Sequence, residues 1–221
     1  MLKIKSQSHL HCLKLTNMKF NKLIYLFALF CISLLTHRLF KSNNVSYVFL
    51  VWNLFLAFIP FWISNYMIQH KKLNYCSVPL LVMWLLFLPN APYILTDLFH
   101  LKVRPPFPLW YDLVLILSFA LCGLCLFFKS LKDMFSLFTT VIKPLYVSIA
   151  TPFVFWIISF GLYLGRYMRF NSWDIIHPLR ILKSSYSVLW QKDTLAFTLI
   201  FSVFMWFLYT LLVQIHHREE V

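Results

Sequence analysis

Long apolar runs are the feature of this sequence that most restricts its fold. The run from Val45 to Ile68 is one of several that approach or exceed the roughly 20 residues needed to cross the hydrocarbon layer as a helix. Hydrophobic residues make up 61% of the chain and charged residues 12%, which is too apolar for a soluble domain. The two-residue alternation of a transmembrane barrel is absent. The sequence therefore predicts an all-α, polytopic transmembrane helix bundle.

About six spans are expected within one domain over residues 23–213, between a basic tail at 1–22 and a short polar tail at 214–221. The expected spans cover residues 23–39, 45–68, 75–88, 109–128, 144–164 and 194–213. Residues 129–143 contain Lys129, Lys132 and Asp133, which predicts a solvated or interfacial connection between spans four and five. Short interfacial helices are expected in the connections after spans three and five.

The positive charge of the chain points to a membrane surface. Its formal net charge is +13, but lysine and arginine are spread through the short connecting segments, where they anchor helix ends and attract lipid headgroups. Membrane lipids are therefore the expected partners, and no nucleic acid is expected. Five lysines precede the first run and two basic residues, Arg38 and Lys41, follow it. This asymmetry predicts that both termini are cytoplasmic.

The third run is interrupted by the polar string PNAPYILTDLFHL, residues 89–101. Pro89 and Pro92 each remove a backbone donor, so carbonyl groups of the preceding turn lose their helical partners. Irregular backbone at membrane depth is tolerated where it is buried in protein or lines a water-filled cavity. We therefore expect helix three to break here, with the Asn90 amide as the nearest substitute donor.

A second polar string, RYMRFNSWDIIHP at residues 166–178, follows the fifth run. With six spans, the connections after spans three and five lie on the same side of the membrane, so the two strings can form one site. Ionisable residues near a membrane are costly and suggest a functional site. The candidate catalytic groups are Asp97 and His100, with one of them acting as a base. The candidate substrate-binding residues are Asn90, Tyr93, Asp112, Arg166, Arg169, Asn171, Trp173 and Asp174.

Two interpretations of these residues remain open. Arg166 and Arg169 can offer bidentate donors to a phosphate or carboxylate, as in the headgroup of a lipid or envelope precursor. Alternatively, Asp97 pairs with one of these arginines and Asp174 caps its own helix, which satisfies the charges without any ligand.

Metal and cofactor chemistry is not predicted. The pairs Asp97/His100 and Asp174/His177 have the i, i+3 spacing of metal ligands, but nearby arginines would oppose a cation. No nucleophile motif, glycine-rich phosphate loop or cofactor fingerprint is present. The Cys122 and Cys125 pair lies among leucine and phenylalanine, where a thiol acts as a small apolar side chain.

Four strings of this sequence resemble a bacterial membrane family catalogued as domain of unknown function 1361. They are WNLFLAFIP at 52–60, FLPNAPYILTDLFHL at 87–101, WYDLVLILSFALCGL at 110–124 and GLYLGRYMRFNSWD at 161–174. The resemblance covers residues 45–210 and implies a multi-pass protein of the cell inner membrane without an assigned activity. It marks as characteristic polar positions Asn53, Asn90, Asp97, Asp112, Arg166, Asn171, Trp173 and Asp174. His177 and the lysine-rich first 20 residues are outside the family's pattern.

Three functions are consistent with the sequence. The first is a polar interfacial site that binds or processes an anionic lipid or envelope headgroup, which leaves enzymatic activity open. The second is a structural or assembly subunit whose polar residues form internal ion pairs. The third is a small-solute transporter, which the scarcity of charges within the expected spans disfavours.

Overall fold

The structure is a computed structural model that describes residues 2–42, 45–70, 73, 77–170, 174 and 178–218. The described residues form helices, and their single pair of bridged residues is an isolated bridge between Arg104 and Phe107. The helices in chain order are α1 (Leu2–Ser42), α2 (Phe49–His70), α3 (Val78–Phe87), α4 (Asn90–Tyr93), the 3-10 helix η2 (Ile94–His100), α5 (Leu109–Phe138), α6 (Pro144–Tyr167), α7 (Pro178–Leu189) and α8 (Lys192–Arg218).

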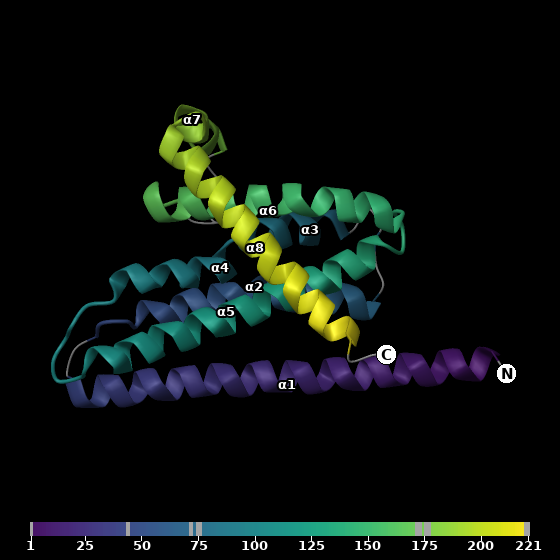
Figure 1. The fold of residues 1–221 in the computed structure, drawn as a ribbon, viewed down its shortest axis with the longest axis horizontal. Helices are drawn as coiled ribbons and strands as arrows, with labels where there is room; N and C mark the ends of the chain where they lie inside the picture. The colour runs from purple at the N-terminus through teal and green to yellow at the C-terminus, as the bar shows by residue number, and fades with distance from the viewer. Residues whose placement is uncertain are drawn as a thin grey trace.

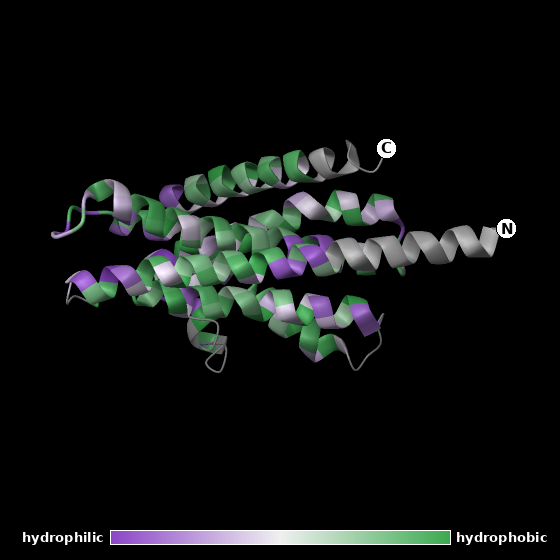
Figure 2. Ribbon diagram, turned by 90° about the horizontal axis from the view of Figure 1, so that it is seen from below, coloured by the Kyte–Doolittle hydropathy of each residue, from purple (hydrophilic) through white to green (hydrophobic). Residues whose placement is uncertain are grey.

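Six segments of the described chain are long and apolar enough to cross a membrane, which confirms the predicted all-α membrane bundle. They are Met18–Ser42, Phe49–His70, Val78–His100, Leu109–Phe138, Pro144–Tyr167 and Lys192–Leu212. Hydrophobic residues follow the helices over most of their length, and hydrophilic ones gather toward helix ends and connections (Figure 2). The start of α1 and the end of α8 lie toward the same end of the molecule (Figure 1).

Helix α5 is the centre of the bundle. It packs against α1, α2, α4 and η2, while α6 packs mainly against α8, which crosses the bundle obliquely (Figure 1). The α5 side chains Leu115, Ile116, Phe119 and Phe127 are fully buried. Burial of large apolar side chains between helices supplies the close packing that holds transmembrane helices together.

The third span breaks as the prolines predict. Helix α3 ends at Phe87, a single turn of α4 follows from Asn90, and the backbone then tightens into the 3-10 helix η2. The side-chain amide of Asn90 donates a hydrogen bond of 2.9 Å to the carbonyl oxygen of Phe87. The amide thus stabilises the break by supplying a partner to a carbonyl group at the interrupted end of α3.

All three glycines of the chain lie against this broken segment. A Cβ atom added at Gly123 of α5 would be 2.7 Å from the carbonyl oxygen of Ala91, and one at Gly161 of α6 would be 3.0 Å from Cγ of Pro89. One at Gly165 would be 3.5 Å from the Tyr93 ring. Gly123 thus lets α5 approach the backbone of α4 closely, and Gly161 and Gly165 let α6 pack against the side chains of Pro89 and Tyr93.

Helix α5 differs from the sequence prediction at its end. Residues 129–138 continue the helix to Phe138 and do not belong to a solvated connection. Lys129 and Asp133 are buried and form an ion pair one helical turn apart, so each compensates the charge of the other. Charges that are paired in this way can be buried at a much lower cost than single ones.

The connections after spans three and five differ from each other. Residues 101–108 after η2 lack helix, so the short helix predicted for this connection is not found there; η2 precedes the connection and belongs to the third span. Helix α7 follows span five, as predicted. Helix α1 extends through the lysine-rich tail to Leu2, well before the start expected for the first span.

Candidate functional site

Asp97 lies at a junction of three helical segments. It is 1% exposed in η2, and both of its carboxylate oxygens accept hydrogen bonds. The Asn53 amide of α2 donates to Oδ2 at 2.8 Å, and Nη1 of Arg166 in α6 donates to Oδ1 at 3.3 Å. The contact between Asp97 and Arg166 therefore joins the two polar strings of the sequence.

Aromatic rings surround the Arg166 guanidinium. Its central carbon lies 5.6 Å from the Tyr93 ring centre and 5.3 Å from the Phe99 ring centre. Nη1 also lies within 3.4 Å of the Tyr93 hydroxyl oxygen. Nε and Nη2 donate no hydrogen bond to any residue that the structure describes. Arg166 is thus held in place through one of its nitrogens and has further donors for a ligand.

A cleft of about 840 Å³ opens beside this junction between α2, α3, α4 and α6. Its polar lining residues are Asn53, Asn90, Tyr93, His100, Arg166 and Arg169. Its remaining lining is mainly apolar and includes Trp52, Leu85, Ile157 and Phe160. Asp97 is not part of the lining, and no aspartate or glutamate contributes to it among the described residues. The cleft therefore combines a cationic end with an apolar wall.

Arg169 adopts a left-handed backbone conformation, with φ of 57°, just after the end of α6. A non-glycine residue in this region is uncommon and carries a modest conformational cost. The side chain is exposed and lines the cleft, and no described residue accepts a hydrogen bond from it. The end of α6 therefore presents two arginines to the same space.

Asp112 lies in a different cluster from the one that the sequence suggested. It is fully buried at the start of α5 and pairs with Arg38 of α1, at 2.6 Å from Nε to Oδ1 and 3.0 Å from Nη2 to Oδ2. The Arg38 guanidinium carbon lies 4.7 Å from the Tyr47 ring centre. The sequence identifies Arg38 only as a charge that orients the first span and does not predict this bidentate pair.

Tyr47 completes that cluster. The Arg104 guanidinium carbon lies 4.6 Å from its ring centre, and its hydroxyl donates a bond of 3.4 Å to the His100 carbonyl. Burial, together with the neighbouring Asp112 carboxylate, raises the pKa of Tyr47, so its hydroxyl stays protonated and can act as a donor. The cluster joins α1 and α5 to the segment that carries His100 and is a structural link at the end of the bundle.

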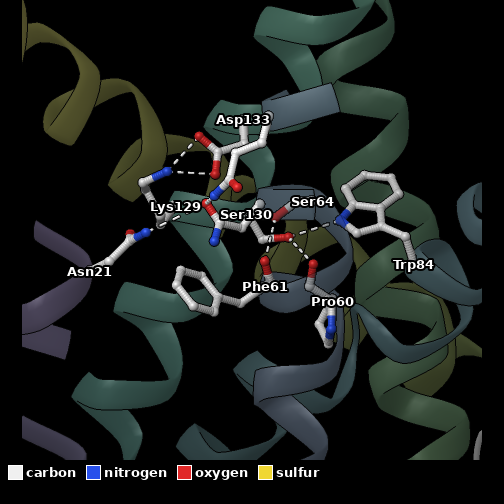
Figure 3. A network of polar contacts seen from close by, with 10 residues as sticks. Asn21, Pro60, Phe61, Ser64, Trp84, Lys129, Ser130 and Asp133 are labelled. Carbon is white, nitrogen blue, oxygen red and sulfur yellow. Dashed lines mark hydrogen bonds and ion pairs between the residues drawn. The ribbon is translucent and has the colours of Figure 1, made fainter. Parts of the chain in front are cut away.

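A further polar network lies between α2, α3 and α5 (Figure 3). The Trp84 indole donates to Ser130 Oγ at 2.8 Å, and Ser130 Oγ donates to the Pro60 carbonyl at 2.9 Å. The Lys129 and Asp133 ion pair lies on the adjacent turns of α5. These contacts join α2, α3 and α5, and the i, i+4 spacing of the charges was the signal in the sequence.

The remaining predicted residues are distributed as follows. Asn90, Tyr93, His100, Arg166 and Arg169 line the cleft. Asn171 and Trp173 lie outside the described residues, as does His177. Asp174 itself has a 3-10 backbone conformation and is half-buried. Within the described part of the chain, no group of three or more histidine, cysteine, aspartate or glutamate side chains could hold a metal ion.

Comparison with protein families identifies the chain. The model of the family described as "Protein of unknown function (DUF1361)" matches residues 52–208. The chain belongs to this family. The matched range of DUF1361 begins at Trp52 and includes every described residue of the cleft, whereas Arg38 precedes it. No curated protein and no solved structure matches the chain.

Proposed function

We propose that this DUF1361 protein binds an anionic ligand in the cleft, with Arg166 and Arg169 holding the anion at its polar end. The observation that carries the proposal is the composition of the lining, which contains two arginines and no acidic residue among the described positions. Planar guanidinium groups present paired donors that match phosphate and carboxylate oxygens. The headgroup of an anionic lipid or envelope precursor is the ligand class that suits a cleft at the end of a membrane span.

The proposal assigns binding and no reaction. Both carboxylate oxygens of Asp97 are occupied, and the residue does not line the cleft. A general base must come within hydrogen-bond reach of the proton that it removes. Asp97 instead positions Arg166, and the lining contains the exposed His100, which forms no ion pair with any described residue.

The location that accompanies this proposal is the inner membrane, with both termini in the cytoplasm. The polar end of the cleft is formed by the end of α6, which lies away from the start of α1 and the end of α8 (Figure 1). The anion would then bind on the outer side. A reporter fused to the C-terminus should be active only if it functions in the cytoplasm; activity of a periplasmic reporter there would overturn this orientation.

Ligand-induced stabilisation tests the binding proposal. The protein purified in an uncharged detergent is heated with increasing concentrations of a single-chain lipid phosphate, and unfolding is followed by tryptophan fluorescence. A ligand at 100 times its dissociation constant adds about 2.7 kcal/mol of stability. The double variant Arg166→Gln/Arg169→Gln should lose this shift, whereas Lys102→Gln, which removes an exposed charge outside the cleft lining, should keep it. An unchanged shift in the double variant would refute the proposal.

A second candidate is a structural role for the same residues. The contacts of Asp97 join α2, η2 and α6, which is the arrangement of an internal ion pair that holds a bundle together. A purely structural role predicts that Arg166→Gln and Arg169→Gln differ strongly in stability, because only Arg166 has described polar partners. It also predicts no stabilisation by anionic lipids in the wild-type protein.

A further inference from the structure

We infer that the ligand is a phosphorylated membrane lipid of net negative charge that enters the cleft sideways from the bilayer. Its headgroup binds Arg166 and Arg169, while its acyl chain lies between α3 and α6. This inference rests on the proposed anion-binding function and adds the route of entry, the position of the acyl chain and the selectivity for the headgroup. Three observations support it: the lateral opening of the cleft, the distribution of polarity along it and the position of α7.

The cleft is open along the flank of the bundle. Among its lining residues, Trp52 is 53% exposed, Val82 57% and Leu85 41%. These apolar side chains belong to the membrane-spanning segments of α2 and α3, so the medium that they contact is lipid. An acyl chain can therefore pass from the bilayer into the cleft without crossing water.

The distribution of polarity along the cleft corresponds to that of a lipid. On α6, the lining runs from Ile157 through Phe160 to Arg166, which at 1.5 Å per residue is a rise of about 14 Å. The apolar residues lie within the span, and the arginines lie at its end. A small soluble anion would use the arginine end alone and would leave the apolar wall without a function.

Helix α7 indicates that the arginine end lies at headgroup depth. Large side chains at positions 179, 182, 186 and 190 follow helical spacing and are strongly exposed, from 64% at Leu182 to 80% at Leu179. Tyr186 in this helix and Trp190 just after its end are residue types favoured at membrane interfaces, and Lys183 is also in α7. Ile181 of the same helix lines the cleft. An apolar face exposed in this way suits the boundary between headgroups and acyl chains.

The absence of acidic residues from the described lining predicts headgroup selectivity. A phosphocholine or phosphoethanolamine headgroup carries a cationic nitrogen that would lie near two arginines without a carboxylate partner. A headgroup that ends in phosphate, or in phosphate and uncharged hydroxyls, lacks this repulsion. Net-anionic lipids should therefore bind more tightly than zwitterionic lipids with the same chains.

The test compares three probes on the full-length protein in an uncharged detergent, with affinities measured by native mass spectrometry and confirmed by thermal shift. Dioleoyl phosphatidic acid, dioleoyl phosphatidylcholine and glycerol 3-phosphate share a phosphate group but differ in charge or in acyl chains. We expect phosphatidylcholine to bind at least 10-fold more weakly than phosphatidic acid, and glycerol 3-phosphate at least 100-fold more weakly.

A pair of variants on α3 tests the position of the acyl chain. Leu85→Gln places an amide in the apolar wall and should weaken phosphatidic acid binding about 10-fold, with glycerol 3-phosphate unaffected. Met83→Gln is the matched control, because Met83 is exposed to a similar degree and does not line the cleft. Its affinity should equal that of the wild type.

The outcomes separate this inference from the proposed function. If glycerol 3-phosphate binds as tightly as phosphatidic acid in a manner that requires Arg166, the anion site stands and the lipid inference fails. Equal binding of phosphatidylcholine and phosphatidic acid would overturn the headgroup selectivity. If no probe depends on Arg166 and Arg169, the proposed function and the inference both fail.

Discussion

The α-carbon of Gly123 in α5 faces the backbone of Ala91 in α4, so closely that an added Cβ would be 2.7 Å from the Ala91 carbonyl oxygen. The same Cβ would be 3.0 Å from Cδ1 of Ile94. Because the nearest atom belongs to backbone, it cannot be relieved by a rotamer change. The broken third span is thus held directly against the central helix, and its position fixes Asn90 and Tyr93 in the cleft.

Gly123→Ala should therefore destabilise the protein. Overpacking of a close-packed interior costs about 1–3 kcal/mol, which outweighs the gain of up to about 1 kcal/mol from placing alanine in a helix. Gly165→Ala is the control, because its Cβ would meet no atom closer than 3.5 Å. Thermal unfolding in detergent should show a lower midpoint for Gly123→Ala only. Equal midpoints would show that α4 can move away from α5.

The break in the third span could be predicted from sequence because proline acts locally. The missing N–H groups of Pro89 and Pro92, only three positions apart, each remove a helical hydrogen bond in any environment. The Gly161-x-x-x-Gly165 spacing favours a close approach by another helix. The identity of that neighbour could not be predicted, since a small-residue face is compatible with any partner, and here it is the broken segment at Pro89 and Tyr93.

The charge pairs show what sequence reasoning missed. Arg38 and Asp112 are 74 positions apart, and each appears alone at the edge of an apolar run, so only the tertiary structure joins them. Lys129 and Asp133 have the spacing of a helical pair. The sequence nevertheless predicts a connection at these positions, because unpaired charges are rare within membrane spans. Paired, they extend α5 well beyond the length that hydropathy indicates.

The Arg38 and Asp112 pair should be essential for folding. Asp112→Asn leaves the fully buried guanidinium without a counter-charge, which costs about 3–5 kcal/mol. Replacing both residues with apolar ones, as in Arg38→Met/Asp112→Leu, should restore much of the loss. Size-exclusion profiles and unfolding midpoints in detergent measure both effects. A stable Asp112→Asn protein, or a double variant worse than the single one, would contradict this assignment.

Ser130 should couple α3 to α2 through its hydroxyl group. Ser130→Ala leaves the buried Trp84 N–H without its acceptor, at a cost of about 1–3 kcal/mol. Ser130→Ala and Trp84→Phe together form a double-mutant cycle. The interaction energy between the two side chains in this cycle should be about 1 kcal/mol. Ser118→Ala is the control, because Ser118 donates only within its own helix, to the Val114 carbonyl. Additive effects of the two substitutions would exclude the coupling.

Asp97→Asn should strengthen the binding of anionic lipid. The Asp97 carboxylate lies 3.3 Å from Arg166 and competes with the ligand for its charge. An amide of the same shape can still accept a hydrogen bond from Asn53, so the junction remains formed. At this distance and an effective dielectric constant of about 20, removing one negative charge can contribute several kcal/mol to binding. Screening by solvent and salt reduces this contribution. We expect an increase in affinity of at least about threefold for phosphatidic acid.

The direction of this change distinguishes the roles considered for Asp97. Asp193→Asn removes a negative charge at the exposed start of α8, outside the cleft lining, and should leave the affinity unchanged. If Asp97 contacted the ligand as a base or acceptor, Asp97→Asn would weaken binding. If its ion pair were needed only for folding, the variant would unfold at a much lower temperature and no increase in affinity would be measured. A rise in affinity with a nearly unchanged midpoint therefore supports a role in which Asp97 positions Arg166 and competes with the anion for its charge.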